Sequence, residues 1–520
     1  MLKKYLIYFG SNAIEEIEAN PYILIDITKG VDFKQIDKMA LDLGINYDNE
    51  KRVISGIKYG LIRSTYNGHA CVLKSNLIEF VINLLDVGAE NVEDGLISLK
   101  AKDEIVIEER ENEEYVYLYA FYHTEEEIAF RINRLQKAKN VKKVLHIETE
   151  LKKVEANSNI ELSDKQKEAV RLVNENNVAI ITGGPGTGKT TIIKTIIDIY
   201  EEKGKKVVLC APTGRAAKRM TETTRKEAST LHRLLEIGKI DEDSLYKNTS
   251  DYEGAPIDGD LIIVDEMSMV DMFLMNYLLK CIYQGTKLIL VGDVDQLASV
   301  GPGSVLKDFI HSEQIATIHL DKIFRQAAKS KIILNAHRIN QGEDFLKKGE
   351  NEEQEELKDD FFFIKETNQE KMLAEVISLC TGRLQNYGNY DFFKSIQVLS
   401  PTKKGILGTK ELNKALQEKL NPNINNLPEK ASMGVVFRVG DRIMQIKNNY
   451  DIYWEKEIFD KKEMGSGVFN GEIGTITEIN EREKRVEIKF DDEKVAWYAF
   501  SDLDQIEHSY AITIHKAQRK

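Results

Sequence analysis

The sequence predicts an α/β protein whose main element is a parallel β-sheet. From about residue 162 onward, short apolar runs alternate with polar loops and helical patterns, the order that a parallel sheet requires. One of these loops, residues 183–190, reads Gly-Gly-Pro-Gly-Thr-Gly-Lys-Thr and follows the G-x-x-x-x-G-K-[ST] pattern. The 520 residues suffice for several domains, each with its own core.

The composition excludes several classes of protein. Apolar residues make up 42% and charged residues 30% of the chain. No run of eighteen apolar residues occurs, so we expect no membrane association and a cytoplasmic location. Four scattered cysteines favour a reducing compartment and argue against a zinc site. A net charge of −13 argues against a general basic coat for nucleic acid, but it is compatible with a local basic groove.

The first 150 residues differ in character from the rest. Residues 23–44 predict two short helices around a possible hairpin at 29–33, a helix–hairpin–helix pattern. The elements expected next are helices over 75–85 and 92–101 and strands over 105–107 and 115–119, joined by a polar turn at 111–113. Helices followed by such a β-wing suggest a winged-helix-like module. Direct DNA contact and packing against another part of the protein are equally compatible with it.

The glycine-rich loop predicts a nucleoside triphosphate site. It follows the apolar run 178–181 and precedes the helical pattern 191–197, so its amides and the helix N-terminus can meet phosphate oxygens. Lys189 can reach the β- and γ-phosphates, and the Thr190 hydroxyl can hold Mg²⁺. The residues expected to bind ATP are Gly184, Pro185, Gly186, Thr187, Gly188, Lys189, Thr190 and Thr191, with Gln166 at the adenine edge.

Polar residues at two further strand ends predict hydrolysis of that nucleotide. Asp265 and Glu266 follow the apolar run 261–264, where an Asp can position Mg²⁺ and a Glu can deprotonate water. Gln296 follows the run 288–291 and can hydrogen-bond the γ-phosphate or the attacking water. Taken singly, the acidic pair could be a helix cap and Gln296 a solvated turn residue. Ligands of open α/β sheets bind at these strand ends, so together the residues indicate an ATPase.

Arg325, in the segment Ile-Phe-Arg-Gln, has the character of an arginine finger. Its guanidinium is always charged and can neutralise charge that develops on the γ-phosphate. A lone arginine is more often a surface ion-pair partner, so the assignment depends on the surrounding motifs. Further along the chain, residues 343–371 are acidic and predict an exposed connection, and 437–500 are rich in short alternating β runs that suggest a small inserted barrel.

The ordered set of motifs resembles the superfamily 1 helicases and is most similar to the RecD-like DNA helicases, in their stand-alone branch. The segments that carry the resemblance are 20–22, 162–170, 183–191, 211–217, 230–235, 264–271, 292–303, 324–326, 399–402 and 510–518.

The resemblance implies two RecA-like lobes with ATP between them. The implied domains are a helix–hairpin–helix region at 1–70, a winged-helix-like module at 71–150, lobe 1 at 151–342 with a hairpin insert at about 236–259, and lobe 2 at 343–520 with an SH3-like insert at about 437–500. It also implies 5′–3′ translocation on single-stranded DNA, unwinding at single-strand/duplex junctions, and a role in DNA repair and recombination. A monomeric motor without an obligate partner subunit is expected. The implied DNA contacts are Thr213, Gly214, Arg215, Thr230 and His232 of lobe 1, and Thr513 and His515 of lobe 2.

The sequence also departs from the family pattern. The motifs lead us to expect a chain truncated at both ends, with the second lobe incomplete and a second γ-phosphate arginine missing after residue 520. Asp32 stands where the hairpin pattern has a glycine. We therefore expect weak or no activity from this chain alone. Three alternatives stay open: a non-enzymatic fragment that binds ATP and DNA, the helicase module of a conjugative relaxase, and an ATPase switch independent of nucleic acid.

Overall fold

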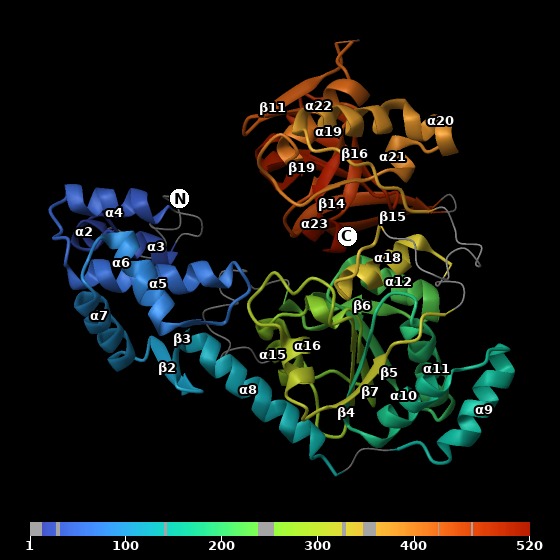
Figure 1. Cartoon of the computed structure of the whole chain (residues 1–520). Coiled ribbons are helices and arrows are strands. Elements are labelled where there is room, and N and C mark those ends of the chain that lie inside the picture. The colour runs from blue at the N-terminus through green and yellow to red at the C-terminus, as the bar shows by residue number, and fades with distance from the viewer. Residues whose placement is uncertain are drawn as a thin grey trace. The chain divides into compact units, whose positions relative to one another are not determined.

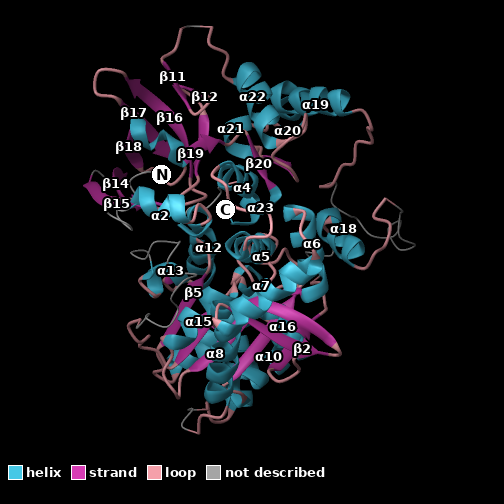
Figure 2. Ribbon diagram, turned by 90° about the vertical axis from the view of Figure 1, so that its left-hand side faces the viewer, coloured by secondary structure: helices cyan, strands magenta, loops and turns pink. Residues whose placement is uncertain are grey.

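The protein divides into two compact units, Met1–Lys358 and Asp359–Lys520. The computed structural model describes residues 13–27, 32–139, 143–237, 254–324, 329–346, 360–424, 426–458 and 461–519. Figure 1 shows the elements in chain order, and Figure 2 distinguishes helices from strands.

The N-terminal part of the first unit is a helical module with a small sheet. Its elements are α2 (Ala13–Ala19), α3 (Ile23–Ile27), α4 (Phe33–Asp42), α5 (Glu50–Thr65), β1 (Cys71–Leu73), α6 (Lys74–Leu85), α7 (Ala89–Ala101), β2 (Ile105–Arg110) and β3 (Glu113–Leu118). The predicted helices over 23–44, 75–85 and 92–101 are confirmed. One hydrophobic cluster runs from Tyr22 to Val116, so the two predicted modules share a core. The domain boundary between them stays a prediction.

Two local features explain how this module is built. Strands β2 and β3 form the predicted hairpin, and the turn residues Glu111 and Asn112 both have positive φ, 52° and 66°. That backbone matches the two-residue turn that suits the twist of paired strands. Asp32 begins α4, and its side chain accepts the Lys34 N–H at 3.2 Å. An N-cap role therefore accounts for a carboxylate at this position. Residues 29–31 of the hairpin predicted at 29–33 lie outside the described residues.

The long helix α8 (Tyr119–Gln136) leads from the N-terminal module to a six-stranded parallel sheet. The sheet has the order β6-β5-β7-β8-β4-β9. Its strands are β4 (Val178–Gly183), β5 (Val207–Ala211), β6 (Ala228–Thr230), β7 (Leu261–Val264), β8 (Lys287–Gly292) and β9 (Ala316–Leu320). The strands predicted at 178–181, 261–264 and 288–291 are confirmed.

Both faces of the sheet are buried, which explains why its strands are apolar runs without polar alternation. In β4, Val178 and Ile180 join one core cluster while Ala179 and Ile181 join the other, as the two-residue period of a strand requires. The helices of the second face are α9 (Ile147–Ser158), α10 (Asp164–Glu175), α11 (Lys189–Glu202) and α12 (Gly214–Thr224).

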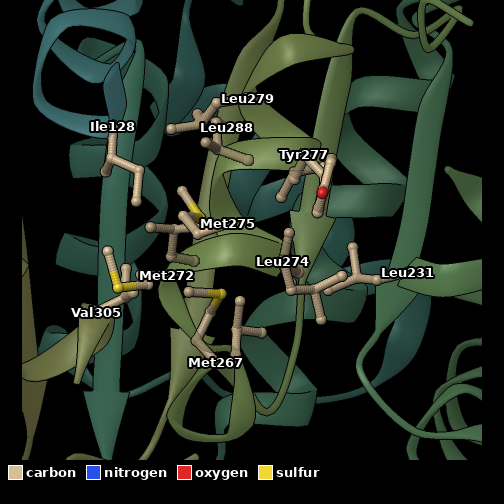
Figure 3. Packing of buried hydrophobic residues seen from close by; sticks show 14 of the residues in the cluster. Ile128, Leu231, Met267, Met272, Leu274, Met275, Tyr277, Leu279, Leu288 and Val305 are labelled. Atoms are coloured by element: carbon tan, nitrogen blue, oxygen red, sulfur yellow. The ribbon is translucent and has the colours of Figure 1, made fainter. Parts of the chain in front are cut away.

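The first face is covered by α8 and by elements from later in the chain. These are α13 (Leu231–Leu234), η3 (Met267–Met269), α15 (Met272–Lys280) and α16 (Val305–His311). Figure 3 shows Ile128 of α8 and Leu231 of α13 on either side of the α15 side chains Met275 and Leu274. The helix α8 thus contributes to the same core as the sheet, which ties the N-terminal module to it. Helix α18 (Lys331–Asn340) is the last described helix of this unit.

The second unit combines helices with an antiparallel sheet. Its first elements are α19 (Gln369–Ser378), η4 (Leu379–Arg383), α20 (Leu384–Gly388), α21 (Phe392–Ser395), β10 (Val398–Ser400) and α22 (Thr409–Leu420). The strands that follow are β11 (Glu429–Ser432), β12 (Val435–Arg438), β13 (Arg442–Gln445), β14 (Asn449–Ile458), β15 (Lys461–Val468), β16 (Ile473–Asn480), β17 (Arg485–Phe490) and β18 (Val495–Ala499). The last elements are η5 (Phe500–Gln505), β19 (Ile506–His508), β20 (Ala511–Thr513) and α23 (Ile514–Arg519).

Seven of these strands form one sheet in the order β15-β14-β18-β17-β16-β13-β19. This sheet gives the β-rich stretch predicted at 437–500 its own hydrophobic core. It extends to His508, because β19 pairs with β13. The three residues of β19 are too few to show an alternating apolar pattern, so this strand could not be predicted from the sequence. Separately, β10 and β20 pair in parallel, with Ser400 opposite Thr513.

The carboxylate of Asp441 joins this sheet to the rest of the second unit. The side chain is fully buried. Its oxygens accept from Gln417 Nε2 (2.7 Å), Asn421 Nδ2 (2.7 Å), the Arg438 N–H (2.7 Å) and the Tyr510 hydroxyl (2.9 Å), and contact His508 Nε2 (3.0 Å). Gln417 belongs to α22, and Tyr510 immediately precedes β20. One buried charge therefore connects the inserted sheet, α22 and the strand that carries Thr513.

Candidate functional site

The predicted nucleotide residues of the first unit gather at one edge of its parallel sheet. Strands β7, β8 and β4 are adjacent, so their carboxyl ends open on the same side. The loops after them carry Asp265–Glu266, Gln296 and the glycine-rich segment, respectively. The Val294 N–H also donates to Thr182 Oγ1 at 3.4 Å, which joins the loop after β8 to the end of β4.

The glycine-rich loop has the conformation of a phosphate cradle. Gly186 and Gly188 have positive φ, 77° and 81°, which non-glycine residues rarely adopt. Gly188 then caps α11, so the free amides of the first helical turn face the loop. A Cβ at Gly183 would lie 2.7 Å from the Leu320 carbonyl oxygen. The loop therefore requires glycines, and its backbone stays open to an anion.

Lys189 lies inside this cradle. Its ammonium donates to the carbonyls of Gly183 and Gly184, the latter at 3.0 Å, and Thr187 Oγ1 also donates to the Gly184 carbonyl at 2.8 Å. These neutral carbonyls can be exchanged for phosphate oxygens, which bind an ammonium more strongly. The Thr190 side chain is exposed in the first turn of α11, and Thr191, half-buried, follows it.

Gln166 is buried against the loop. It closes a capping box at the start of α10: its Oε1 accepts the Ser163 N–H at 2.9 Å and its own N–H donates to Ser163 Oγ at 3.3 Å. A Cβ at Gly188 would lie only 2.4 Å from Gln166 Nε2. The amide nitrogen therefore lies directly over the phosphate loop, while the cap fixes the side chain.

Asp265 and Glu266 form an acidic pair at the end of β7. The Asp265 N–H donates to the Cys210 carbonyl at 3.0 Å, and Asp265 Oδ1 accepts the Glu266 N–H at 2.9 Å. Glu266 has φ 54°, a left-handed conformation that a side chain rarely adopts and that is concentrated at functional sites. Burial raises the pKa of Asp265, and the charge of Lys189 acts in the opposite direction. Burial also raises the pKa of Glu266, and the charge of Asp265 adds to this effect.

The donor set fits a magnesium ion. A hydroxyl from Thr190 and a carboxylate from Asp265 are the hard oxygen ligands that Mg²⁺ accepts, alongside water and phosphate. The cost of burying the Asp265 charge, seen in its raised pKa, is what a divalent cation would offset. Among the described residues, no group of three or more His, Cys, Asp or Glu side chains forms a metal site by itself. A site completed by nucleotide phosphates agrees with that arrangement.

Gln296 lies on an exposed turn after β8. Its N–H donates to the Asp293 carbonyl at 3.2 Å, and the buried Asp293 carboxylate accepts the Asp295 N–H at 3.1 Å. Asp293 was not among the predicted residues; its place directly after an apolar strand is the signal that could have found it. Arg219 on α12 was also missed. Its charge lowers the pKa of both Asp265 and Glu266 and so partly opposes the effect of burial.

The predicted arginine finger, Arg325, lies outside the described residues. The residue before it is anchored to the phosphate loop: the Phe324 N–H donates to the Gly186 carbonyl at 3.1 Å. The Phe324 ring also lies 2.8 Å from where a Cβ at Gly188 would be. Most of the predicted hairpin insert at 236–259 lies outside the described residues as well, since 238–253 are not described.

The predicted DNA contacts of the first unit lie beside one another at the sheet edge. Thr213 caps α12 by accepting the Ala216 N–H at 3.3 Å, and Thr230 caps α13 by accepting the Arg233 N–H at 3.2 Å. Strands β5 and β6 pair in parallel with Ala211 opposite Thr230, which brings these two caps together. Gly214 and Arg215 are exposed, and His232 is half-buried.

The two predicted contacts of the second unit lie at the end of β20 and in the helix after it. Thr513 is buried, and its Oγ1 accepts the Lys516 N–H at 3.3 Å at the start of α23. His515 is exposed on that helix. The four cysteines all lie within the described residues and form no disulfide with one another. Among the described residues, none of the helices is long and apolar enough to cross a membrane.

Three family models match the chain. One described as an AAA domain covers residues 161–358, one described as the SH3 domain of ATP-dependent RecD-like DNA helicases covers 412–490, and one described as the HHH domain of ATP-dependent RecD2 DNA helicases covers 1–71. These matches account for the phosphate loop, the inserted sheet and the N-terminal helices. The fold is thus a RecA-like P-loop lobe and an SH3-like insert, preceded by helical modules.

Similar proteins and structures include helicases. The ATP-dependent RecD2 DNA helicase of Deinococcus radiodurans is 29% identical over 98% of this chain and 66% of its own length. The RecBCD enzyme subunit RecD of Buchnera aphidicola is 28% identical over 68% of this chain and 65% of its own length. The chain thus spans just under two thirds of these relatives. A solved Pif1 helicase from Bacteroides with ADP-AlF3 and ssDNA aligns at 18% identity with a TM-score of 0.35, covering 69% of this chain and 84% of that one. The three family models and the alignment over 98% of this chain thus make it similar to the RecD-like helicases.

Proposed function

We propose that this chain is the motor of an ATP-dependent DNA helicase, which hydrolyses ATP to move along single-stranded DNA and unwind duplexes. One observation carries the proposal. The loops that bear Lys189, the Asp265–Glu266 pair and Gln296 follow three adjacent strands of one parallel sheet. A phosphate cradle, an acidic pair and a polar amide at one sheet edge are the set that phosphoryl transfer to water requires.

Each of these residues has a step in the proposed reaction. Lys189 leaves the carbonyls of Gly183 and Gly184 and turns to the β- and γ-phosphates. Glu266 accepts the proton of the attacking water, and its raised pKa makes it a stronger base than a solvated glutamate. Gln296 orients that water, and Arg325 neutralises the charge that develops on the γ-phosphate. Thr190 and Asp265 hold Mg²⁺, which supplies charge stabilisation for the phosphate oxygens when bound.

The DNA path of the first unit follows from the neighbouring loops. Thr213, Thr230 and the exposed Arg215 offer hydroxyls, helix-cap amides and a cation, which bind phosphate without selecting sequence. Gly214 leaves this backbone accessible, since nothing lies within 4 Å of where its Cβ would be. His232, Thr513 and His515 complete the proposed contacts. Movement from 5′ to 3′ by a monomer, on single strands and at junctions, is proposed from the family resemblance.

A strand-displacement assay tests the function and its direction. Wild-type chain is given ATP, Mg²⁺ and a duplex with a single-stranded tail on either the 5′ or the 3′ side, and the Lys189→Ala variant is the matched control. The proposal predicts unwinding of the 5′-tailed substrate only, with none by the variant. Equal unwinding of both substrates would overturn the direction.

Because the chain spans just under two thirds of the relatives compared above, one further outcome of the assay is informative. Nucleotide binding by the wild type with neither hydrolysis nor unwinding would favour a chain that holds ATP and DNA without turning over. ATP hydrolysis measured with and without DNA separates a DNA motor from an ATPase switch that needs no nucleic acid.

A further inference from the structure

A histidine with no assigned role lies against the phosphate loop. His337 belongs to α18, which is more than 140 residues along the chain from Gly184. A Cβ at Gly184 would lie 2.7 Å from His337 Cε1 and 3.3 Å from its Nε2. The imidazole edge therefore packs directly on the first residue after the β4 strand. Only a glycine leaves space for it.

The Nε2 atom of His337 is buried and finds no hydrogen-bond partner among the described residues. Leaving a buried polar atom unpaired is unfavourable, because the atom loses its hydrogen bonds to water and gains none in return. Native proteins contain few such atoms, and each calls for an explanation such as a bound ion or ligand. A nitrogen in this state beside an anion-binding loop points to a ligand oxygen as its missing partner.

The neighbouring contacts indicate which oxygen. The Gly184 carbonyl accepts from Lys189 Nζ at 3.0 Å and from Thr187 Oγ1 at 2.8 Å. In this motif the lysine serves the β- and γ-phosphates, so the Gly184 peptide marks the end of the cradle where the terminal phosphates bind. An imidazole N–H donates well to a phosphate oxygen, and a hydrogen bond to a charged acceptor is about twice as strong as one between neutral groups.

We propose that His337 is a further phosphate-contacting residue, whose Nε2–H donates to the terminal phosphate of the bound nucleoside triphosphate. The inference rests on the proposed nucleotide site and deepens it by adding a group that distinguishes triphosphate from diphosphate. Because the contact exists only with the γ-phosphate in place, its loss must affect ATP more than ADP.

Equilibrium binding of a non-hydrolysable ATP analogue and of ADP tests this directly. The proteins are the wild type, His337→Ala, and His337→Gln, whose amide N–H can replace the imidazole donor. His311→Ala, at an exposed histidine on α16, is the matched control. We expect His337→Ala to weaken binding of the analogue about tenfold or more and binding of ADP less than twofold. His337→Gln should recover part of the loss, and the control should change neither.

Two results would overturn the inference. If His337→Ala weakens binding of the analogue and of ADP equally, His337 only packs against Gly184. If binding of both is unchanged, His337 does not contribute to the site. Failure of the wild type to bind either nucleotide would instead refute the proposed function itself. Thermal unfolding of each variant shows whether a loss comes from misfolding, and in that case the His337→Gln result decides.

A steric test checks the contact independently. Gly184→Ala places a methyl group against the imidazole, so it should weaken binding of both nucleotides. Adding His337→Ala to Gly184→Ala removes the collision and should restore ADP binding more than binding of the analogue. No recovery of ADP binding in the double variant would contradict the packing from which the inference starts.

Discussion

The N–H of Phe324 donates to the carbonyl of Gly186 at 3.1 Å, which fixes the residue before Arg325 to the centre of the phosphate loop. A finger residue acts only if its guanidinium reaches the γ-phosphate, and one residue spans about 3.5 Å. This hydrogen bond fixes the residue before the predicted finger, and the role of Arg325 itself stays a prediction.

Replacing the proposed base should separate binding from chemistry. Glu266→Gln keeps the size of the side chain and its left-handed backbone, but the amide cannot accept a proton. We expect ATP turnover to fall by about 10²-fold or more, with ATP binding retained. Steady-state hydrolysis and equilibrium nucleotide binding measure the two effects. Unaltered turnover would contradict the role of Glu266.

The packing of Gln166 and Phe324 over Gly188 predicts a steric effect on binding. In Gly188→Ala the new Cβ would lie 2.4 Å from Gln166 Nε2 and 2.8 Å from Phe324, at φ 81°. Gly204→Ala is a matched control, because Gly204 also has positive φ, 66°, but nothing within 4 Å of its Cβ position. Nucleotide affinity should fall sharply in the first variant and stay near wild type in the second. Similar affinities for both would refute the close packing.

The buried carboxylate of Asp441 predicts a stability effect confined to the second unit. Asp441→Asn directs an amide N–H₂ at groups that now donate to the carboxylate, and disrupting a buried charge network of this kind costs about 3 kcal/mol or more. Both tryptophans of the chain, Trp454 and Trp497, lie in this unit, so urea unfolding followed by their fluorescence reports on it. Asp451→Asn, at an exposed aspartate, should leave the transition unchanged.

The same carboxylate predicts how that stability depends on pH. Burial alone would raise the pKa of Asp441, but the hydrogen bond and charge of His508, with the other donors, lower it below the ordinary value of 3.8. A lowered pKa means that the contribution is present above pH 3.8 and is lost as the pH falls through the folded-state value. The stability difference between wild type and Asp441→Asn should persist at pH 5 and shrink below pH 3.8. A difference that grows on acidification would reverse the assigned sign.

The sequence was sufficient for the strands and loops that carry the nucleotide site. Runs such as 178–181 and 261–264 are buried on both sheet faces and therefore stand out as continuous apolar segments, and the glycine pattern needs no tertiary context. The single core of the N-terminal module could not be predicted from the sequence. Its cluster joins Tyr22 to Val116, and such distant packing leaves no local sequence signal.

Site residues that depend on distant contacts could not be found from the sequence. His337 sits within an ordinary amphipathic helix pattern, and only the fold brings it against Gly184. Arg219 reads as one of several exposed cations on α12, although its charge acts on Asp265 and Glu266. Asp441 likewise follows a glycine in a β-rich stretch, where a turn is the simplest interpretation until its five partners are seen.

ATP hydrolysis by the wild-type chain, with and without single-stranded DNA, tests the central claim most directly, with Lys189→Ala as the control. The ammonium of Lys189 is the group that the loop presents to the phosphates, so its removal should abolish turnover. We predict hydrolysis that single-stranded DNA stimulates severalfold and that is absent from the variant. Hydrolysis that persists in Lys189→Ala, or that DNA does not change, would contradict a DNA-driven motor at this site.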